Sequence, residues 1–295
     1  MSIVMIKSYA KLFTQRLGID THKILFEIFE RNAQKVMEIK YSSIDAATKK
    51  LLHAENERFH YGDAIITEKA SEYVLTSFTI DRIAFIRENA LLKNDDIVAD
   101  LGDSNGIFLR SCQKDGISVN ISNPAVKSLH KRGMETIMAD IEYLPFKDNS
   151  IYSVFLFETL EHVPNPITLL NEISRICSDI LIVSIPFVEK TKIHPYNYDP
   201  ARPVYQHHIF EFNRDDFLTI ITHTPFTLGS EKVAVVLDGR MSLSDRLVFF
   251  LWYHIMEHDT FCGCFKKFYM CSLIKPGKTD RDQAMATTRK KQAGN

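Results

Sequence analysis

The chain has 295 residues, of which 45% are hydrophobic and 25% charged, a composition that predicts an ordinary globular protein with a substantial core. Lys and Arg (36) nearly balance Asp and Glu (37), so no overall field attracts nucleic acid, and a nucleic-acid partner is not expected. The odd number of cysteines, five, predicts reduced thiols and a cytoplasmic location. The N-terminus lacks the layout of a signal peptide, and the longest apolar run, residues 247–256, is too short for a membrane helix.

The first third of the chain, residues 1–92, is predicted to be helical. Apolar residues recur there at helical spacing, first at Ile24, Leu25, Ile28 and Phe29 and later around Phe78. We expect an N-terminal helical region that caps an active site.

From residue 95 the pattern changes to short β-branched runs that alternate with helical segments. Such alternation is typical of βαβ units, whose parallel strands are continuous hydrophobic runs because both faces of the sheet are covered. A main domain over 93–276 and a disordered polar tail over 277–295 are expected. The predicted strands are 97–101, 117–121, 135–139, 151–157, 179–185, 232–237 and 267–274.

The first of these strands runs directly into a glycine loop, Asp100-Leu101-Gly102-Asp103-Ser104-Asn105-Gly106, and then into a predicted helix. This arrangement presents backbone amides at the carboxyl edge of a parallel sheet, where ligands bind. The glycines lie four apart, so the loop fits neither the G-x-G-x-x-G pattern of dinucleotide sites nor a phosphate loop with Gly-Lys-Ser/Thr. A tight turn that merely needs glycine is the alternative.

A second motif follows, ADIEYLPFKDNS (139–150) and then FETLEHVPNP (157–166). With the glycine loop, it resembles the class I S-adenosylmethionine-dependent methyltransferases, in particular their type 11-like subgroup, over about residues 95–275. The resemblance implies a methyltransferase enzyme with S-adenosyl-L-methionine as cofactor. It also implies an α/β fold: a Rossmann-like, doubly wound, mostly parallel sheet of seven strands with the last one reversed.

The resemblance also assigns roles to residues of the cofactor site. The glycine loop would shape the pocket for the methionine part, Asp140 would hold the adenine amino group, and Ile141 would lie beside the ring. Asn120 stands where the family usually has an acid that binds the ribose hydroxyls, a departure that predicts a loss on the order of 1 kcal/mol. An acid at 103 would repel the cofactor's carboxylate unless it faces its ammonium group. The predicted cofactor-binding residues are Asp100, Gly102, Ser104, Gly106, Asn120, Asp140, Ile141, Phe157 and Glu158.

The segment 185–217 is rich in Pro, Tyr and His and is predicted to form a loop over the cofactor's methyl group. One of the pair His207 and His208 is the candidate catalytic base, which a poor nucleophile such as a hydroxyl would need. A loop whose aromatic residues only pack it onto the domain is the alternative. The candidate substrate-binding residues are His194, Tyr196, Tyr198 and Tyr205.

These patterns predict methyl transfer onto a small-molecule, glycan or lipid-linked acceptor. They favour oxygen as the atom that is methylated. A non-catalytic methyltransferase-like protein with a regulatory or scaffolding role is the alternative, because the departures at 103 and 120 weaken the cofactor site. The glycine spacing opposes a nicotinamide oxidoreductase. The apolar segment 243–256 is expected to pack against the N-terminal helices, or else to contact a membrane surface or a second copy of the chain.

A metal-like pattern lies near the C-terminus. His254-Ile255-Met256-Glu257-His258 matches H-x-x-E-H, and Cys262, Cys264 and Cys271 follow. The Cys-x-Cys spacing is not the usual one for zinc, and no metal is expected. His162, in LEHVPNP, is interpreted as structural or pocket-lining.

Overall fold

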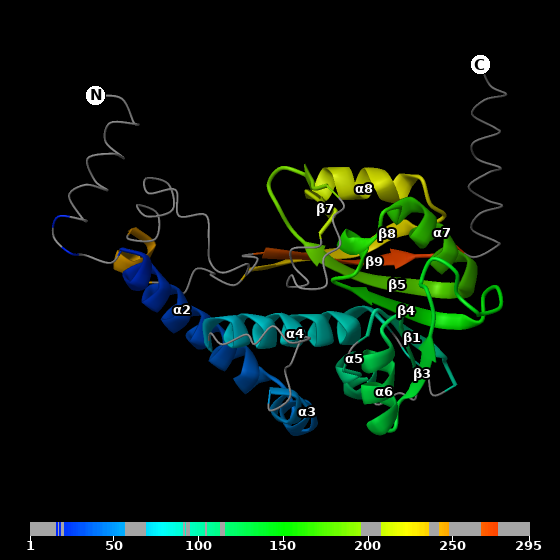
Figure 1. Cartoon of the computed structure of the whole chain (residues 1–295), viewed down its shortest axis with the longest axis horizontal. Helices are drawn as coiled ribbons and strands as arrows, with labels where there is room; N and C mark the ends of the chain where they lie inside the picture. Colours follow the sequence, from blue (N-terminus) through cyan, green and yellow to red (C-terminus); the bar gives the residue numbers. More distant parts are fainter. Residues whose placement is uncertain are drawn as a thin grey trace, which may run out of the picture. The chain divides into compact units, whose positions relative to one another are not determined.

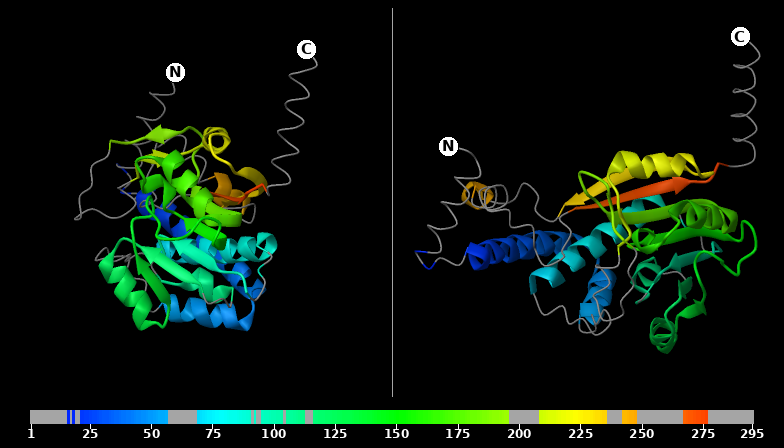
Figure 2. Two further views of the ribbon diagram at one scale, coloured as in Figure 1. Left: turned by 90° about the vertical axis from the view of Figure 1, so that its right-hand side faces the viewer. Right: turned by 45° about the horizontal axis from the view of Figure 1, so that its top comes forward.

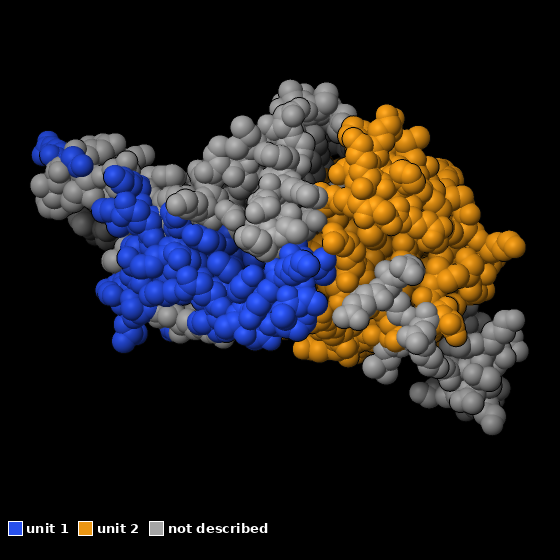
Figure 3. All heavy atoms as spheres, turned by 90° about the horizontal axis from the view of Figure 1, so that it is seen from below, with its two compact units in different colours: residues 1–81, 235–266 blue, residues 82–234, 267–295 orange. Residues whose placement is uncertain are grey.

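The computed structural model describes residues 16, 18, 21–56, 69–90, 92, 95–103, 105–112, 116–195, 208–235, 242–247 and 267–276. The chain folds into two compact units (Figures 1 and 3). Unit 1 comprises residues 1–81 and 235–266, and unit 2 comprises residues 82–234 and 267–295. The domain boundaries predicted at 92/93 and 276/277, and the capping role of the helical region, stay predictions.

Unit 2 contains a seven-stranded sheet in the order β3-β2-β1-β4-β5-β9-β8. The pairs β1–β2, β1–β4, β2–β3 and β4–β5 are parallel, whereas β9 runs antiparallel to β5. The predicted Rossmann-like sheet with its last strand reversed is therefore confirmed. The strands are β1 (Val98–Leu101), β2 (Ile117–Asn120), β3 (Glu135–Met138), β4 (Ile151–Phe157), β5 (Cys177–Pro186), β8 (Thr227–Val235) and β9 (Lys267–Ile274).

The last strand in the chain lies inside the sheet rather than at its edge. β9 is hydrogen-bonded between β5 and β8, and Figure 2 shows β8 (yellow) and β9 (orange-red) side by side and running in opposite directions. β8 begins at Thr227, five residues before the predicted start of this strand at 232. The strand therefore includes Gly229, a residue that strand propensity disfavours.

Helices cover both faces of this sheet. α5 contacts β1, α6 contacts β2 and β3, and α7 contacts β5 and α8 (Figure 1). Several begin at a capping side chain, since Ser122, Asn165 and Asn213 each accept a hydrogen bond from the first turn. The helices of unit 2 are α5 (Ile107–Ser111), α6 (Asn123–Lys131), the 3₁₀ turn η1 (Leu160–His162), α7 (Pro166–Ile176) and α8 (Arg214–Thr222).

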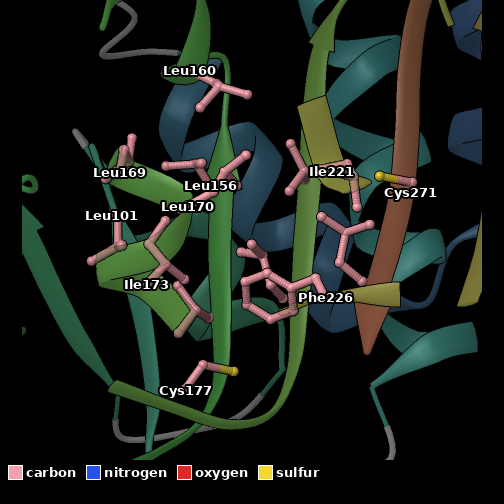
Figure 4. Close-up of a cluster of buried hydrophobic side chains, with 14 of the residues drawn as sticks. Leu101, Leu156, Leu160, Leu169, Leu170, Ile173, Cys177, Ile221, Phe226 and Cys271 are labelled. Carbon is pink, nitrogen blue, oxygen red and sulfur yellow. The ribbon is translucent and has the colours of Figure 1, made fainter. Parts of the chain in front are cut away.

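The core of unit 2 forms where α7 and α8 pack on the sheet. Figure 4 shows Leu169, Leu170 and Ile173 of α7 gathered near Leu156 of β4. Phe155, the preceding residue in β4, is also fully buried but lies outside this cluster, as expected when both faces of a parallel strand are covered.

Unit 1 contains helix α2 (Thr21–Ser43), helix α3 (Ala46–Asn56) and most of helix α4 (Lys69–Asn89). Lys40 joins α2 to α4 through Asp81 at 2.5 Å and Ser77 at 2.7 Å. The helical character predicted for this part of the chain is thus confirmed in the described residues. None of the described helices has the length and apolarity needed to span a membrane.

Candidate functional site

The carboxyl ends of β1, β2, β3, β4 and β5 meet at one edge of the sheet, because these strands are parallel. The segments that leave this edge are the glycine loop after β1, the turns after β2 and β3, η1 after β4 and the segment after β5. The predicted site residues belong to these segments or to the strand ends before them. Two short strands, β6 (Lys192–Ile193) and β7 (Phe210–Glu211), pair after β5.

The glycine loop needs glycine for two separate reasons. Gly102 and Gly106 both have left-handed backbone angles, with φ of 83° and 74°, which disfavour other residues. Gly102 also lies directly against the segment after β4: a Cβ added there would be 2.4 Å from Oγ1 of Thr159. The loop is therefore tightly packed as well as turned.

Asp103 holds this loop together from inside. The residue is buried, and its Oδ1 accepts hydrogen bonds from the backbone amides of Asn105 (2.9 Å) and Gly106 (2.7 Å). Its Oδ2 accepts a 2.6 Å bond from the hydroxyl of Ser118 in β2. The carboxylate thus binds the loop's own amides, which the sequence could not indicate.

Asn120, at the end of β2, supports the same loop from the other side. Its Nδ2 donates to the backbone oxygens of Gly102 (3.2 Å) and Asp103 (2.7 Å), and its Oδ1 accepts from the amide of Ser122 (2.8 Å). An aspartate could not make the first two bonds because it has no N–H to donate. The structure therefore supplies a reason for the asparagine.

Asp100 carries an oxygen atom without a partner. The residue is 2% exposed, and its Oδ2 has no hydrogen-bond partner among the described residues. Burial, with the nearby charge of Asp103, raises the pKa of Asp100 well above its usual range, and Arg82 acts in the opposite direction. A donor or a positive charge at this oxygen would therefore be stabilising.

The two residues predicted at the adenine ring follow β3. Asp140 is exposed, and its Oδ1 accepts from the amide of Glu142 at 3.0 Å. Ile141 is partly buried and packs against the core. Asp140 is therefore accessible to a ligand, whereas Ile141 also helps to hold the turn.

Glu158 follows β4 in a strained conformation, with a left-handed φ of 47°. Its Oε1 accepts from the hydroxyl of Ser184 (2.7 Å) and lies 2.9 Å from a guanidinium nitrogen of Arg82. Burial raises the pKa of Glu158, and the ion pair with Arg82 opposes that rise. The neighbouring Phe157 packs edge-on against Phe108, with ring centroids 4.5 Å apart.

His208, one of the two candidate bases, is buried among acidic side chains. It is 7% exposed, its Nδ1 lies 3.5 Å from Oε1 of Glu211, and its Nε2 lies 4.0 Å from Oε1 of Glu161. Its ring meets that of His162 edge-on, at 4.7 Å between centroids. Contact with His208 is the main cause that lowers the pKa of Glu211.

The backbone fixes His208 beside η1. The amide of Ile209 donates to the carbonyl of Glu161 (2.8 Å), and the amide of His194 donates to the carbonyl of Ile209 (2.8 Å). His194, a predicted substrate-binding residue, places its Nε2 3.8 Å from Oε1 of Glu211. Ser104, Tyr196, Tyr198, Tyr205 and His207 lie outside the described residues, as do His254, Glu257, His258, Cys262 and Cys264.

The sequence prediction missed Arg82, Glu161 and Glu211 as parts of this edge. Arg82 lies more than seventy residues before its partner, so no local pattern connects the two. Glu161 and His162 belong to the FETLEHVPNP motif. Two acidic residues three positions apart, Glu158 and Glu161, directly follow a strand there, and this spacing could have indicated that both lie at the site. His162 was interpreted as structural or pocket-lining, and its contact with His208 is consistent with either description.

Comparison with solved structures supports this architecture. Geranyl diphosphate C-methyltransferase from Streptomyces coelicolor A3(2), solved with Mg²⁺, geranyl-S-thiolodiphosphate and S-adenosyl-L-homocysteine, is 11% identical with a TM-score of 0.50. The match covers 83% of this chain and 98% of that one, and it shows a shared fold. An S-adenosylmethionine-dependent methyltransferase from Thermotoga maritima is 18% identical with a TM-score of 0.45, over 66% and 88% of the two chains. No curated protein sequence matches the chain.

The family comparison decides the assignment. Residues 99–179, from β1 to the start of β5, match the family described as the methyltransferase domain. The chain contains a class I methyltransferase domain. The methyl donor of this class is S-adenosylmethionine, as the sequence resemblance implied.

The edge of the methyltransferase domain fits this cofactor at two points. The unpartnered oxygen of Asp100 suits the ammonium group of the methionine part, and the accessible carboxylate of Asp140 suits the adenine amino group. The fit is poorer at the glycine loop. Asp103 already accepts hydrogen bonds from the amides of Asn105 and Gly106, so other groups would have to donate to the cofactor's carboxylate. When bound, the sulfonium supplies an activated methyl group, and the chain's own residues must position the acceptor and exclude water.

Proposed function

We propose that this methyltransferase transfers the methyl group of S-adenosylmethionine to an oxygen atom of a small-molecule, glycan or lipid-linked acceptor. The observation that carries the proposal is the buried group formed by His208, Glu161 and Glu211. Thr159 packs on Gly102 of the glycine loop, and Glu161, two residues after Thr159, lies 4.0 Å from His208, so that the group is close to this loop in space.

The chemistry explains why such a group favours oxygen. Methyl transfer from a sulfonium is a direct displacement, so an acceptor that is already nucleophilic needs only alignment. A hydroxyl is a poor nucleophile until it loses its proton, and an imidazole held by a carboxylate can assist that loss. His208 with Glu211 provides this arrangement, and His208 remains the candidate catalytic base.

The acceptor is proposed from the composition and pattern of the sequence. The near balance of positive and negative charge in the sequence does not favour a polyanion. The aromatic and histidine side chains predicted to recognise the acceptor, with the exception of His194, lie outside the described residues, as does most of the segment 243–256 proposed to contact a membrane or a second copy. The acceptor class therefore follows from the oxygen chemistry and the sequence.

Calorimetric titration with S-adenosylmethionine tests the cofactor assignment first. Wild type is expected to bind with a dissociation constant in the micromolar range, and Asp140→Ala to bind at least tenfold more weakly, because it loses a charge-assisted bond of about 1.5–3 kcal/mol. Asp95→Ala, which removes an exposed carboxylate before β1, is the matched control and should bind as wild type. No binding to wild type would instead make the non-catalytic, scaffolding function the leading one.

Turnover on a panel of hydroxylated acceptors tests the oxygen chemistry. His208→Ala is expected to lower kcat by about 10²-fold or more while cofactor affinity stays within a few-fold of wild type. His223→Ala, an exposed histidine after α8, is the control and should keep full turnover. Unchanged turnover in both His207→Ala and His208→Ala would remove the activating role from this pair.

A further inference from the structure

Glu161, His162 and His208 bring three metal-ligating atoms together. One ligand atom from each side chain can be chosen so that all three lie within 4.8 Å of one another. Glu161 and His208 are buried, and His162 is partly buried. Two of these residues belong to η1, and the third comes from the segment after β5.

The carboxylate of Glu161 indicates that something belongs between these side chains. The residue is 1% exposed, and neither of its oxygens accepts a hydrogen bond from another described residue. The imidazole of His208, at 4.0 Å, lies beyond hydrogen-bond distance. A buried carboxyl group in this state either stays protonated or needs a partner for its charge, and a bound metal ion would supply that partner.

The surrounding charges add to the case. The carboxylates of Glu158 and Glu211 are the acidic neighbours of Glu161, and each has a cation of its own. A guanidinium nitrogen of Arg82 lies 2.9 Å from Glu158, and Nζ of Lys192 lies 3.3 Å from Glu211. Among the described residues, no Lys or Arg forms an ion pair with Glu161.

We propose that Glu161, His162 and His208 bind a divalent transition-metal ion, with Zn²⁺ as the best match. Two imidazoles and one carboxylate are a common ligand set of catalytic zinc sites, which keep a fourth position open. Mg²⁺ is a poorer match, since it prefers carboxylate, carbonyl and water oxygens to imidazole nitrogens.

Glu211 provides the outer support that metal-binding histidines usually have. Its Oε1 lies 3.5 Å from Nδ1 of His208, so that the other ring nitrogen, Nε2, faces Glu161. A carboxylate in this position fixes the tautomer and the orientation of a ligating imidazole once the two are at hydrogen-bond distance. The bond from the amide of Ile209 to the carbonyl of Glu161 holds the two ligand segments together.

The geometry requires only small side-chain movements. Zinc bonds of roughly 2.0–2.1 Å in a tetrahedral site place the ligand atoms roughly 3.3 Å apart. Closing the present spacing requires shifts of about an ångström, within reach of rotations about the side-chain bonds of Glu161 and His162.

If the proposed function holds, a cation here would activate the acceptor's hydroxyl in place of the imidazole of His208. Its open position would take the acceptor's hydroxyl, whose pKa a bound metal lowers. The hydroxyl proton would then pass to solvent, the oxygen would attack the methyl carbon, and the carbon–sulfur bond would break to leave a neutral thioether. His208 would act as a ligand in this scheme, and its loss would lower turnover as proposed above.

The test is zinc binding by the full chain without any acceptor. Protein stripped with a chelator is titrated with Zn²⁺ by calorimetry, and Co²⁺ serves as a spectroscopic probe of the same ligands. Wild type should bind one zinc ion per chain, and Glu161→Gln and His162→Ala should each weaken binding at least 100-fold. His223→Ala should bind as wild type.

Thermal melting separates a metal ligand from a structural residue. Metal-free Glu161→Gln should melt at or above the temperature of wild type, because an amide of the same shape replaces a carboxyl group whose charged form has no partner. Zinc should raise the melting temperature of wild type but not that of Glu161→Gln. If zinc raised the melting temperatures of wild type and Glu161→Gln equally, Glu161 would not be a zinc ligand and the proposed site would be wrong.

One further variant excludes the competing motif. In His254→Ala/His258→Ala the H-x-x-E-H ligands are absent, and one zinc ion per chain should still bind. Loss of zinc from this variant, no zinc binding by wild type, or unchanged affinity in both Glu161→Gln and His162→Ala would overturn the proposal. Zinc-loaded protein that binds S-adenosylmethionine yet methylates no hydroxyl would contradict the proposed function alone.

Discussion

At the scale of single residues, two departures from the family pattern turn out to support each other. Asp103 accepts hydrogen bonds from the backbone amides of its own loop, and Asn120 donates hydrogen bonds to the carbonyls of the same loop. The acid and the amide are therefore complementary, since the loop's donors and acceptors are each bound by a side chain of the right kind. This pairing explains both residues without a ligand.

The pairing predicts that restoring the family's usual acid would do harm. In Asn120→Asp, the one nitrogen that donates both bonds becomes an oxygen that faces the carbonyls of Gly102 and Asp103. The free energy of unfolding should fall by about 2 kcal/mol, more than in Asn120→Ala, which loses the bonds without adding charge. Urea unfolding with calorimetry of S-adenosylmethionine checks this. A variant as stable as wild type that binds the cofactor more tightly would show that Asn120 is instead a weakened ribose ligand.

At the scale of elements, Arg175 of α7 fixes the turn that contains the Leu-Pro-Phe motif. Its guanidinium donates to the carbonyls of Leu144 (2.9 Å) and Phe146 (2.7 Å) and to both carboxylate oxygens of Glu172. Glu172 in turn accepts from the amide of Leu144 at 2.8 Å. The motif is therefore held by the helix that follows β4, although it lies before that strand in the chain.

Arg175→Ala should destabilise the domain by about 2 kcal/mol at pH 7, because two partly buried carbonyls and the carboxylate of Glu172 lose their donor. Lys147→Ala, an exposed change in the same turn, is the control and should be nearly neutral. Urea unfolding measures both. An effect of Arg175→Ala as small as that of the control would contradict the bracing role.

The ion pair of Arg175 with Glu172 makes the stability of the domain depend on pH. Hydrogen bonds from Arg175 lower the pKa of Glu172, so the stabilisation is fully present above the ordinary carboxyl pKa of about 4.3 and is lost as pH falls through the lowered value. The difference in unfolding free energy between wild type and Arg175→Ala should therefore shrink below about pH 4. A difference that stays constant from pH 7 to pH 3 would show that only the carbonyl bonds matter.

At the scale of the whole molecule, the sheet depends on a strand near the end of the chain. β9 pairs with β5 along seven residues from Ile180 to Pro186 and contributes Tyr269, Cys271 and Leu273 to the core. Because it lies between β5 and β8, its loss would open two strand edges in the middle of the sheet.

Truncation tests this dependence. A chain that ends at residue 276 should keep the fold of the sheet, whereas one that ends at residue 266 should lose cooperative unfolding and aggregate. Circular dichroism and size-exclusion chromatography distinguish the two results. A soluble, cooperatively folded chain without β9 would show that the sheet is stable as six strands.

Much of the sheet could be predicted from the sequence by itself. The apolar runs from Ile97 to Ile185 define five strands because strands buried on both faces must be continuously hydrophobic, and the glycine loop with the Leu-Pro-Phe motif indicates the methyltransferase family. The family resemblance assigned Asp100 and Asp140 to the cofactor site, and the histidine-rich loop after the fifth predicted strand indicated His208.

Only the tertiary structure decided which side chains meet. Arg82 pairs with Glu158, and His208 faces Glu161 and Glu211, over separations that no local pattern encodes. The inward direction of Asp103 and the unpartnered oxygens of Asp100 and Glu161 depend on burial by segments far away in the chain. Periodicity reports which face of an element is apolar, whereas the state of a buried charge depends on every element packed around it.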